Sequence, residues 1–135
     1  MGSSIDGIQI VAVHALPTQE FAEERITGAL LPQTRFASAS INFVPVNGAQ
    51  TPHYQDRPQG GDEIVFVYYG KFRIVSGEWR SEVFDTKQIG PIYFLVRSGT
   101  PATVENCGTD IVRFYSVFAP PFAEGEVHFL EKSAE

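Results

Sequence analysis

The stretch TPHYQDRPQGGDEIVFVYYG, residues 51–70, combines a polar segment with a strongly apolar one and decides how this chain is interpreted. His53 and Gln55 stand two residues apart, and residues at this spacing share one face of a strand. A glycine-containing turn follows, and Glu63 then opens an apolar strand that ends at Gly70. We therefore expect adjoining strands that present an imidazole and a carboxyl group to each other.

The rest of the chain continues this pattern of short strands separated by turns. Runs of β-branched and aromatic residues cover 8–16, 35–46, 63–70, 71–75, 91–97 and 110–120. Gly, Pro, Asn and Asp punctuate these runs. Only residues 18–26, with Thr18 as a cap and acids in the first turn, suggest a short helix. The spacing predicts an all-β sandwich or barrel with little helix.

Size and composition indicate one domain and exclude several classes of partner. A chain of 135 residues, 43% of them hydrophobic, is enough for one core and too short for two ordinary domains. A net charge of −6, with only ten scattered basic residues, argues against nucleic acid as a partner. No apolar run approaches the ~20 residues of a membrane span, and no secretory leader is visible, so we expect a cytoplasmic protein without a membrane partner. Cys107 is the only cysteine, and we interpret it as structural.

Alternation along residues 110–120 leaves two arrangements open. Arg113 and Tyr115 share one face of this strand, and Phe114 and Phe118 share the other. In a closed barrel Arg113 and Tyr115 could point into the lumen. If the strand packs against another subunit, the two phenylalanines could instead form the interface.

These features resemble the two sequence motifs of the cupin superfamily. The first motif runs Gly, five residues, His-x-His, three or four residues, Glu, six residues, Gly; here Gly48, His53, Gln55, Glu63 and Gly70 follow its order, with a longer loop before Glu63. The second motif ends in Pro-x-Gly, two residues, His, three residues, Asn; here Arg97, Gly99, Ala102 and Asn106 occupy those places. The resemblance covers roughly residues 35–122.

The resemblance implies an all-β fold, the cupin double-stranded β-helix or jelly-roll barrel. It implies a single domain over residues 1–135, with its barrel core at about 35–122. We expect a homodimer in which the N-terminal strand and the C-terminal tail make dimer contacts.

In the cupin superfamily two histidines and a glutamate of the first motif and a histidine of the second hold a divalent metal. The matching positions here are His53, Gln55, Glu63 and Ala102. An amide oxygen is a poor ligand for these metals, alanine supplies none, and three strong ligands are the usual minimum for a catalytic centre. We therefore expect no metal ligands and no cofactor; a divalent metal held by His53 and Glu63 is the less favoured alternative.

The resemblance further implies a biosynthetic small-molecule enzyme, such as a cyclase, isomerase or lyase that acts on a carbonyl or aromatic intermediate. In that interpretation the catalytic residues are His53, which moves the proton, with Glu63 and Tyr115. Gln55 and Tyr115 would bind an enolate-like oxygen, and Arg113 an anionic or carbonyl end of the substrate. The remaining substrate-binding residues we predict are Tyr69, Phe66 and Asn42, with Phe94 as further aromatic lining.

Two rival functions stay open at this point. One is a metal-dependent cupin oxygenase or lyase that uses His53, Glu63 and unexpected ligands. The other is a cupin that binds small molecules without catalysis, which the loss of two histidines favours.

Overall fold

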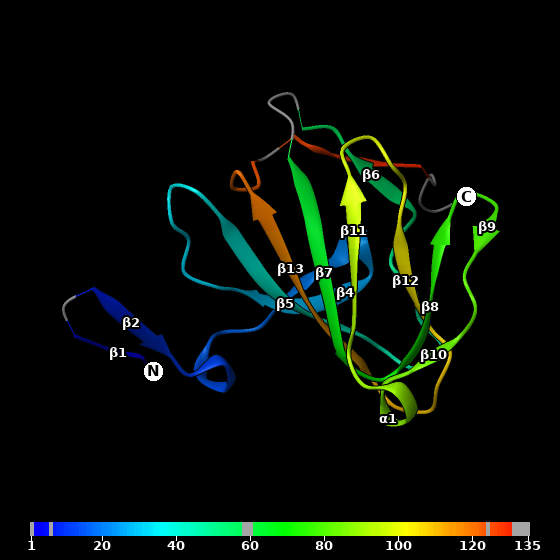
Figure 1. Cartoon of the computed structure of the whole chain (residues 1–135), viewed down its shortest axis with the longest axis horizontal. Coiled ribbons are helices and arrows are strands. Elements are labelled where there is room, and N and C mark those ends of the chain that lie inside the picture. Colours follow the sequence, from blue (N-terminus) through cyan, green and yellow to red (C-terminus); the bar gives the residue numbers. More distant parts are fainter. Residues whose placement is uncertain (1, 6, 58–60, 124, 131–135) are drawn as a thin grey trace.

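The computed structural model describes residues 2–5, 7–57, 61–123 and 125–130. Its larger sheet holds six antiparallel strands (Figure 1). In spatial order they are β11 (Ile92–Arg97), β7 (Asp62–Tyr69), β13 (Val112–Ala119), β5 (Ser38–Val44), β4 (Ile26–Leu30) and β3 (Gln19–Phe21). Four of the β-branched and aromatic runs of the sequence, 35–46, 63–70, 91–97 and 110–120, therefore supply strands of this sheet.

The second layer is built around β8 (Lys71–Ser76), which pairs with β10 (Phe84–Asp85), β9 (Trp79–Arg80) and β12 (Thr103–Asn106). Strand β6 (His53–Gln55) pairs with β14 (Val127–Phe129). The backbone N–H of Ala102 donates to the carbonyl of His53 at 3.2 Å, and that of Gly99 donates to Gln55 at 2.7 Å. These bonds join β6 to the segment leading into β12, so β6 and β14 extend the second layer.

The apolar core lies between the two layers. Its buried members are Val44, Val65, Val67, Phe72, Val104, Val112 and Phe114, together with Ile26. Along β13 the inward positions alternate with exposed or half-buried ones, as expected for a strand with one face in a core. The predicted all-β barrel with little helix is confirmed. Within the described residues, α-helix is confined to the short α1 (Thr86–Ile89).

The predicted helix at residues 18–26 is wrong. The segment instead forms β3, a 3₁₀ turn at Ala22–Glu24 and the start of β4. Arg25 adopts a left-handed backbone with φ of 62°, which ends the turn. The reversal lets β3 pair with β4, from Gln19 opposite Gly28 to Phe21 opposite Ile26. Tertiary pairing therefore overrides a weak local preference for helix.

The expected strand at 8–16 is shorter than predicted. Strand β2 (Ile8–Val11) pairs with β1 (Gly2–Ile5), and a 3₁₀ turn at Val13–Ala15 follows. Figure 1 shows this hairpin projecting away from the barrel. The C-terminal strand β14 pairs with β6 of the same chain. Dimer contacts by either segment stay a prediction. Within the described residues, no helix has the length and apolarity needed to cross a membrane.

Candidate functional site

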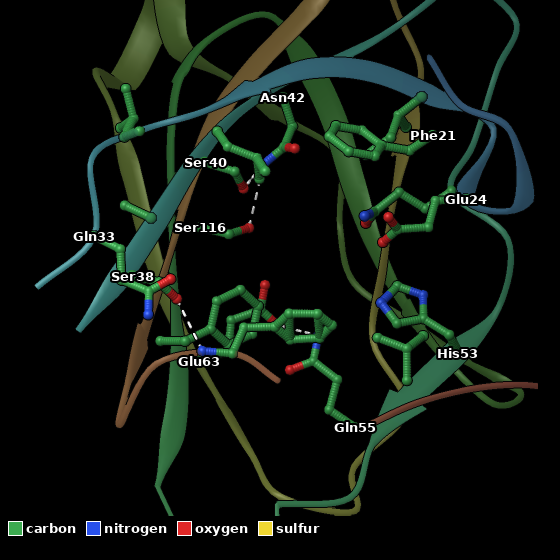
Figure 2. A pocket seen from close by; sticks show the side chains of 18 residues that line it. Phe21, Glu24, Gln33, Ser38, Ser40, Asn42, His53, Gln55, Glu63 and Ser116 are labelled. Carbon is green, nitrogen blue, oxygen red and sulfur yellow. Dashed lines mark hydrogen bonds between the residues drawn. The ribbon is translucent and has the colours of Figure 1, made fainter. Parts of the chain in front are cut away.

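A cavity of about 360 Å³ opens inside the barrel (Figure 2). Its polar lining comprises Glu24, Gln33, Ser38, Ser40, Asn42, Gln50, His53, Gln55, Glu63 and Ser116. Its apolar lining comprises Phe21, Ile26, Leu30, Leu31, Ala39, Phe118, Phe122 and Val127. A concave, mixed surface of this size suits a small molecule.

His53 is held in one tautomer by the backbone. Its side chain is buried, with 4% exposure, and Nδ1 lies 2.7 Å from the carbonyl oxygen of Thr51. A carbonyl only accepts, so Nδ1 carries the hydrogen and Nε2 keeps its lone pair. Burial lowers the pKa of His53 below 6.5, and the bond to Thr51 opposes this shift more weakly. His53 is therefore a neutral imidazole near pH 7 with a basic nitrogen available.

Glu63 contributes a carboxyl group to the cavity wall and lies near the start of β7. Burial raises the pKa of Glu63 to about 7. Hydrogen bonds from Ser116 and Gln55 stabilise the ionised form and oppose the shift, and the charge of Glu24 adds to it. The Gln55 bond runs from Nε2 to Oε1 over 3.3 Å. Glu63 can therefore give or take a proton near neutral pH.

A short chain of hydrogen bonds orients the Glu63 carboxyl group. The Nδ2 of Asn42 donates to Ser40 Oγ at 3.1 Å and to Ser116 Oγ at 3.4 Å. Because Ser116 accepts from Asn42, its own hydrogen is free to be donated to Glu63. The chain crosses the large sheet from β5 through β13 to β7, which are neighbouring strands. It helps to position Glu63 and opposes the larger effect of burial on its pKa.

Glu24 is a second carboxyl group of the cavity that the sequence interpretation missed. Figure 2 shows the side chains of Glu24 and His53 on the same side of the cavity, both directed into it. The backbone carbonyl of Glu24 accepts from the N–H of Thr51 at 3.1 Å, which ties the 3₁₀ turn to the chain entering β6. Burial, and then the charge of Glu23, raise the pKa of Glu24.

Four of the predicted site residues lie together in this cavity: His53, Gln55, Glu63 and Asn42. Three of them are buried, at 4%, 9% and 5% exposure for His53, Gln55 and Asn42. The shared face of His53 and Gln55 follows from their spacing on β6. Their chemical roles stay predictions.

The other predicted site residues require a correction, because they do not line the cavity. Tyr115 is half-buried and packs its ring 5.2 Å from that of Tyr68. Arg113 is exposed, with its guanidinium 5.6 Å from the ring centres of Phe43 and Tyr69. The hydroxyl of Tyr69 donates to Asp110 at 2.6 Å.

Phe66 is also outside the cavity, with 39% of its surface exposed, and Phe94 packs against the core instead.

The reason that Arg113 and Tyr115 lie outside the cavity is the packing of β13. Phe114 and Phe118 fill the inner face, so alternation turns Arg113 and Tyr115 outward. Ser116, which the sequence interpretation missed, lies on this inner face. A small polar residue between two core phenylalanines was the signal for it.

The residues at the expected ligand positions do not fit a metal centre. Gln55 turns an N–H toward Glu63, and Ala102 contributes only its backbone N–H to the carbonyl of His53. Within the described parts of the chain, no group of three or more His, Cys, Asp or Glu side chains is arranged to hold an ion. Among the described residues, His53 and Glu63 thus lack a third strong ligand.

Comparison with known proteins adds structural neighbours. A scan against protein-family models found no match, and a search of curated proteins found no related sequence. Among solved structures, the polyketide cyclase RemF from Streptomyces resistomycificus is similar with a TM-score of 0.74 and 16% identity, over 93% of this chain and 87% of that one. A double-stranded β-helix protein from Klebsiella pneumoniae has a TM-score of 0.69 and 15% identity, over 91% and 97%.

A third similar structure is Streptomyces PAC13, a histidine-to-glutamine variant with uridine, with a TM-score of 0.65 and 13% identity, over 89% of this chain and 88% of that one. At these identities the likeness concerns the fold. The chain has the cupin double-stranded β-helix fold, as its sequence motifs implied.

Proposed function

We propose that this chain is a small-molecule enzyme that transfers protons inside its barrel without a metal, in the cyclisation, isomerisation or elimination of a carbonyl or aromatic intermediate. One observation carries the proposal: a buried, neutral His53 and a carboxyl group with a pKa of about 7 line the same cavity. Two titratable groups poised in this way are typical of acid–base sites.

The roles follow from the protonation states. Nε2 of His53 takes a proton from a carbon next to a carbonyl group, and the electrons of the broken C–H bond move to the carbonyl oxygen. Protonated Glu63 gives its proton to that oxygen, or to a hydroxyl group that leaves as water in an elimination. Ser116 and Asn42 position Glu63 and do not themselves react. Such proton transfers accelerate reactions by roughly 10²–10⁴-fold.

The structural neighbours support this proposal at the level of the fold only. RemF is a polyketide cyclase, and PAC13 was solved with uridine, so this barrel accommodates small-molecule ligands in other proteins. A homodimer in the cytoplasm remains part of the proposal.

Exchange of an acidic C–H proton with solvent tests the proposal without knowledge of the natural substrate. The bicyclic ketone 2-tetralone is incubated with the protein in D₂O containing EDTA, and NMR follows deuterium incorporation next to the carbonyl. We expect catalysed exchange that falls by about 10²-fold or more in His53→Gln and in Glu63→Gln. Glu82→Gln, at an exposed position, is the matched control.

Three results would count against the proposal. Exchange no faster than with the control protein lysozyme would favour a non-catalytic binding protein. Exchange that survives His53→Gln would remove the assigned base. Exchange lost with EDTA and restored by Zn²⁺ or Fe²⁺ would favour the metal-dependent alternative. Circular dichroism establishes that each variant is folded.

A further inference from the structure

We propose that the cavity admits uncharged ligands and rejects anions, with Glu24 and Glu63 as the residues that set this selectivity. The inference rests on the proposed function, because it concerns the substrate class of the same cavity. It differs from the expectation that Arg113 holds an anionic end of the substrate.

The charge distribution of the cavity wall is one-sided. Glu24 enters from the 3₁₀ turn before β4, and Glu63 enters from β7. Among the described residues that line the cavity, none is Lys or Arg. His53 is neutral because burial lowers its pKa. An incoming carboxylate or phosphate would therefore lose its hydration without gaining a cationic partner.

The cation behind this wall is Arg57, whose two terminal nitrogens are engaged while its buried Nε has no hydrogen-bond partner. Arg57 is 3% exposed and is not part of the cavity lining. Its Nη1 donates to Glu126 Oε1 at 2.9 Å, its Nη2 donates to the carbonyl of Pro120, and its guanidinium lies 5.3 Å from the ring centre of Phe118. Phe118, unlike Arg57, lines the cavity. Arg57 acts on Glu63 through its field, and because it is 3% exposed and outside the cavity lining it does not reach an anion in the cavity.

The neutral part of the lining indicates what does bind. The hydroxyl groups of Ser38 and Ser40 and the amide of Gln33 provide donors and acceptors along one side. Phe21 and Phe122, with the leucines of the lining, provide an apolar surface. Figure 2 shows the labelled polar groups spread around the cavity, with Glu24 and His53 across from Ser38 and Gln33. The site fits an uncharged molecule with an apolar body and hydroxyl or carbonyl groups on its edge.

The expected selectivity follows from Coulomb's law. Two like charges about 6 Å apart in surroundings with an effective dielectric constant near 20 repel enough to weaken binding on the order of 100-fold. Each carboxylate contributes a penalty of this kind when ionised. A neutral ligand of the same shape is unaffected.

A matched pair of probes tests this directly. Naphthalene-2-carboxamide is uncharged, and naphthalene-2-carboxylate has nearly the same shape with one negative charge. Isothermal titration calorimetry at pH 8, above the pKa of about 7 of Glu63, measures both affinities. We expect the carboxamide to bind at least 30-fold more tightly than the carboxylate, with a smaller ratio in Glu24→Gln and in Glu63→Gln. In the double variant the two affinities should agree within about threefold.

Several outcomes would overturn the inference. The first is equal affinity of the unsubstituted protein for the carboxamide and the carboxylate, and the second is no binding of the carboxamide. The third is a preference for the carboxamide that neither Glu24→Gln nor Glu63→Gln changes. The single variants keep the test available if the double variant does not fold, and exposed Glu82→Gln is the control. Binding requires no proton transfer. If the protein prefers the carboxamide as expected but deuterium exchange of 2-tetralone does not depend on His53, the proposed function is refuted and this inference is retained.

Discussion

Replacement of Glu63 by glutamine should change how the stability of the protein depends on pH. Burial raises the pKa of Glu63 from 4.5 to about 7 in the folded protein. At 1.36 kcal/mol per pKa unit, this difference of roughly 2.5 units corresponds to about 3 kcal/mol. Because the folded state holds the proton more tightly, this contribution to stability is complete below pH 4.5 and is lost as the pH rises through 7.

Glutamine keeps the shape of the side chain and one acceptor oxygen but does not titrate. Urea unfolding, measured at half-unit steps from pH 4.5 to pH 8.5, gives the free energy of unfolding of both proteins. The difference between Glu63→Gln and the unsubstituted protein isolates Glu63 from the other titrating groups. We expect that difference to move in favour of the variant by about 3 kcal/mol across this range, mostly between pH 4.5 and pH 7.

The exposed Glu82→Gln serves as the matched control and should show a change of less than about 0.5 kcal/mol. A Glu63→Gln difference that stays flat with pH would refute the reasoning, since it would mean that burial in the cavity does not penalise the Glu63 charge. A difference of opposite sign would mean that Ser116 and Gln55 outweigh burial.

Four further predictions concern the same site. NMR titration should place the pKa of His53 below 6.5, with Nδ1 protonated in the neutral form; a midpoint above 6.5 would contradict the role of burial. Ser116→Ala removes a hydrogen bond to the ionised carboxylate, so carboxyl ¹³C NMR should show the pKa of Glu63 above about 7, and an unchanged value would exclude that bond. The exchange rate of 2-tetralone should fall below the pKa of His53 and again above pH 7, whereas a rate that only rises with pH would remove Glu63 as the acid. Arg57→Met leaves Glu126 without its buried partner and should lower the free energy of unfolding by about 3 kcal/mol in urea, against less than about 0.5 kcal/mol for exposed Arg80→Met.

The strand pattern was predictable because it depends on local order along the chain. His53 and Gln55 share a face through their spacing, and motif order placed Glu63 beside them. The same alternation divided β13 correctly into two sets but did not say which set faces inward. That choice depends on the volume of Phe114 and Phe118 in the core, which is a property of the assembled layers.

Glu24 shows why the rest of the site could not be predicted from short stretches of sequence. Its acid-rich surroundings resemble a helix start, yet the chain reverses at Arg25 and pairs as strands. The bond between the Glu24 carbonyl and the Thr51 N–H joins segments far apart in sequence. Ser116 likewise meets Asn42 across 74 residues. Neither contact produces a periodic pattern in the amino-acid sequence from which it could be predicted.

The pairing of β6 with β14 has a consequence for the order in which the protein is assembled. The strand that carries His53 and Gln55 is bordered by residues 127–129, and Arg57 is clamped by Glu126, 69 residues later in the chain. Closing a contact of such long range costs chain entropy before it is rewarded. The six-stranded sheet, in contrast, pairs without β14. We therefore expect the large sheet to be able to form before the wall around His53 is complete, and the wall to close when β14 pairs with β6.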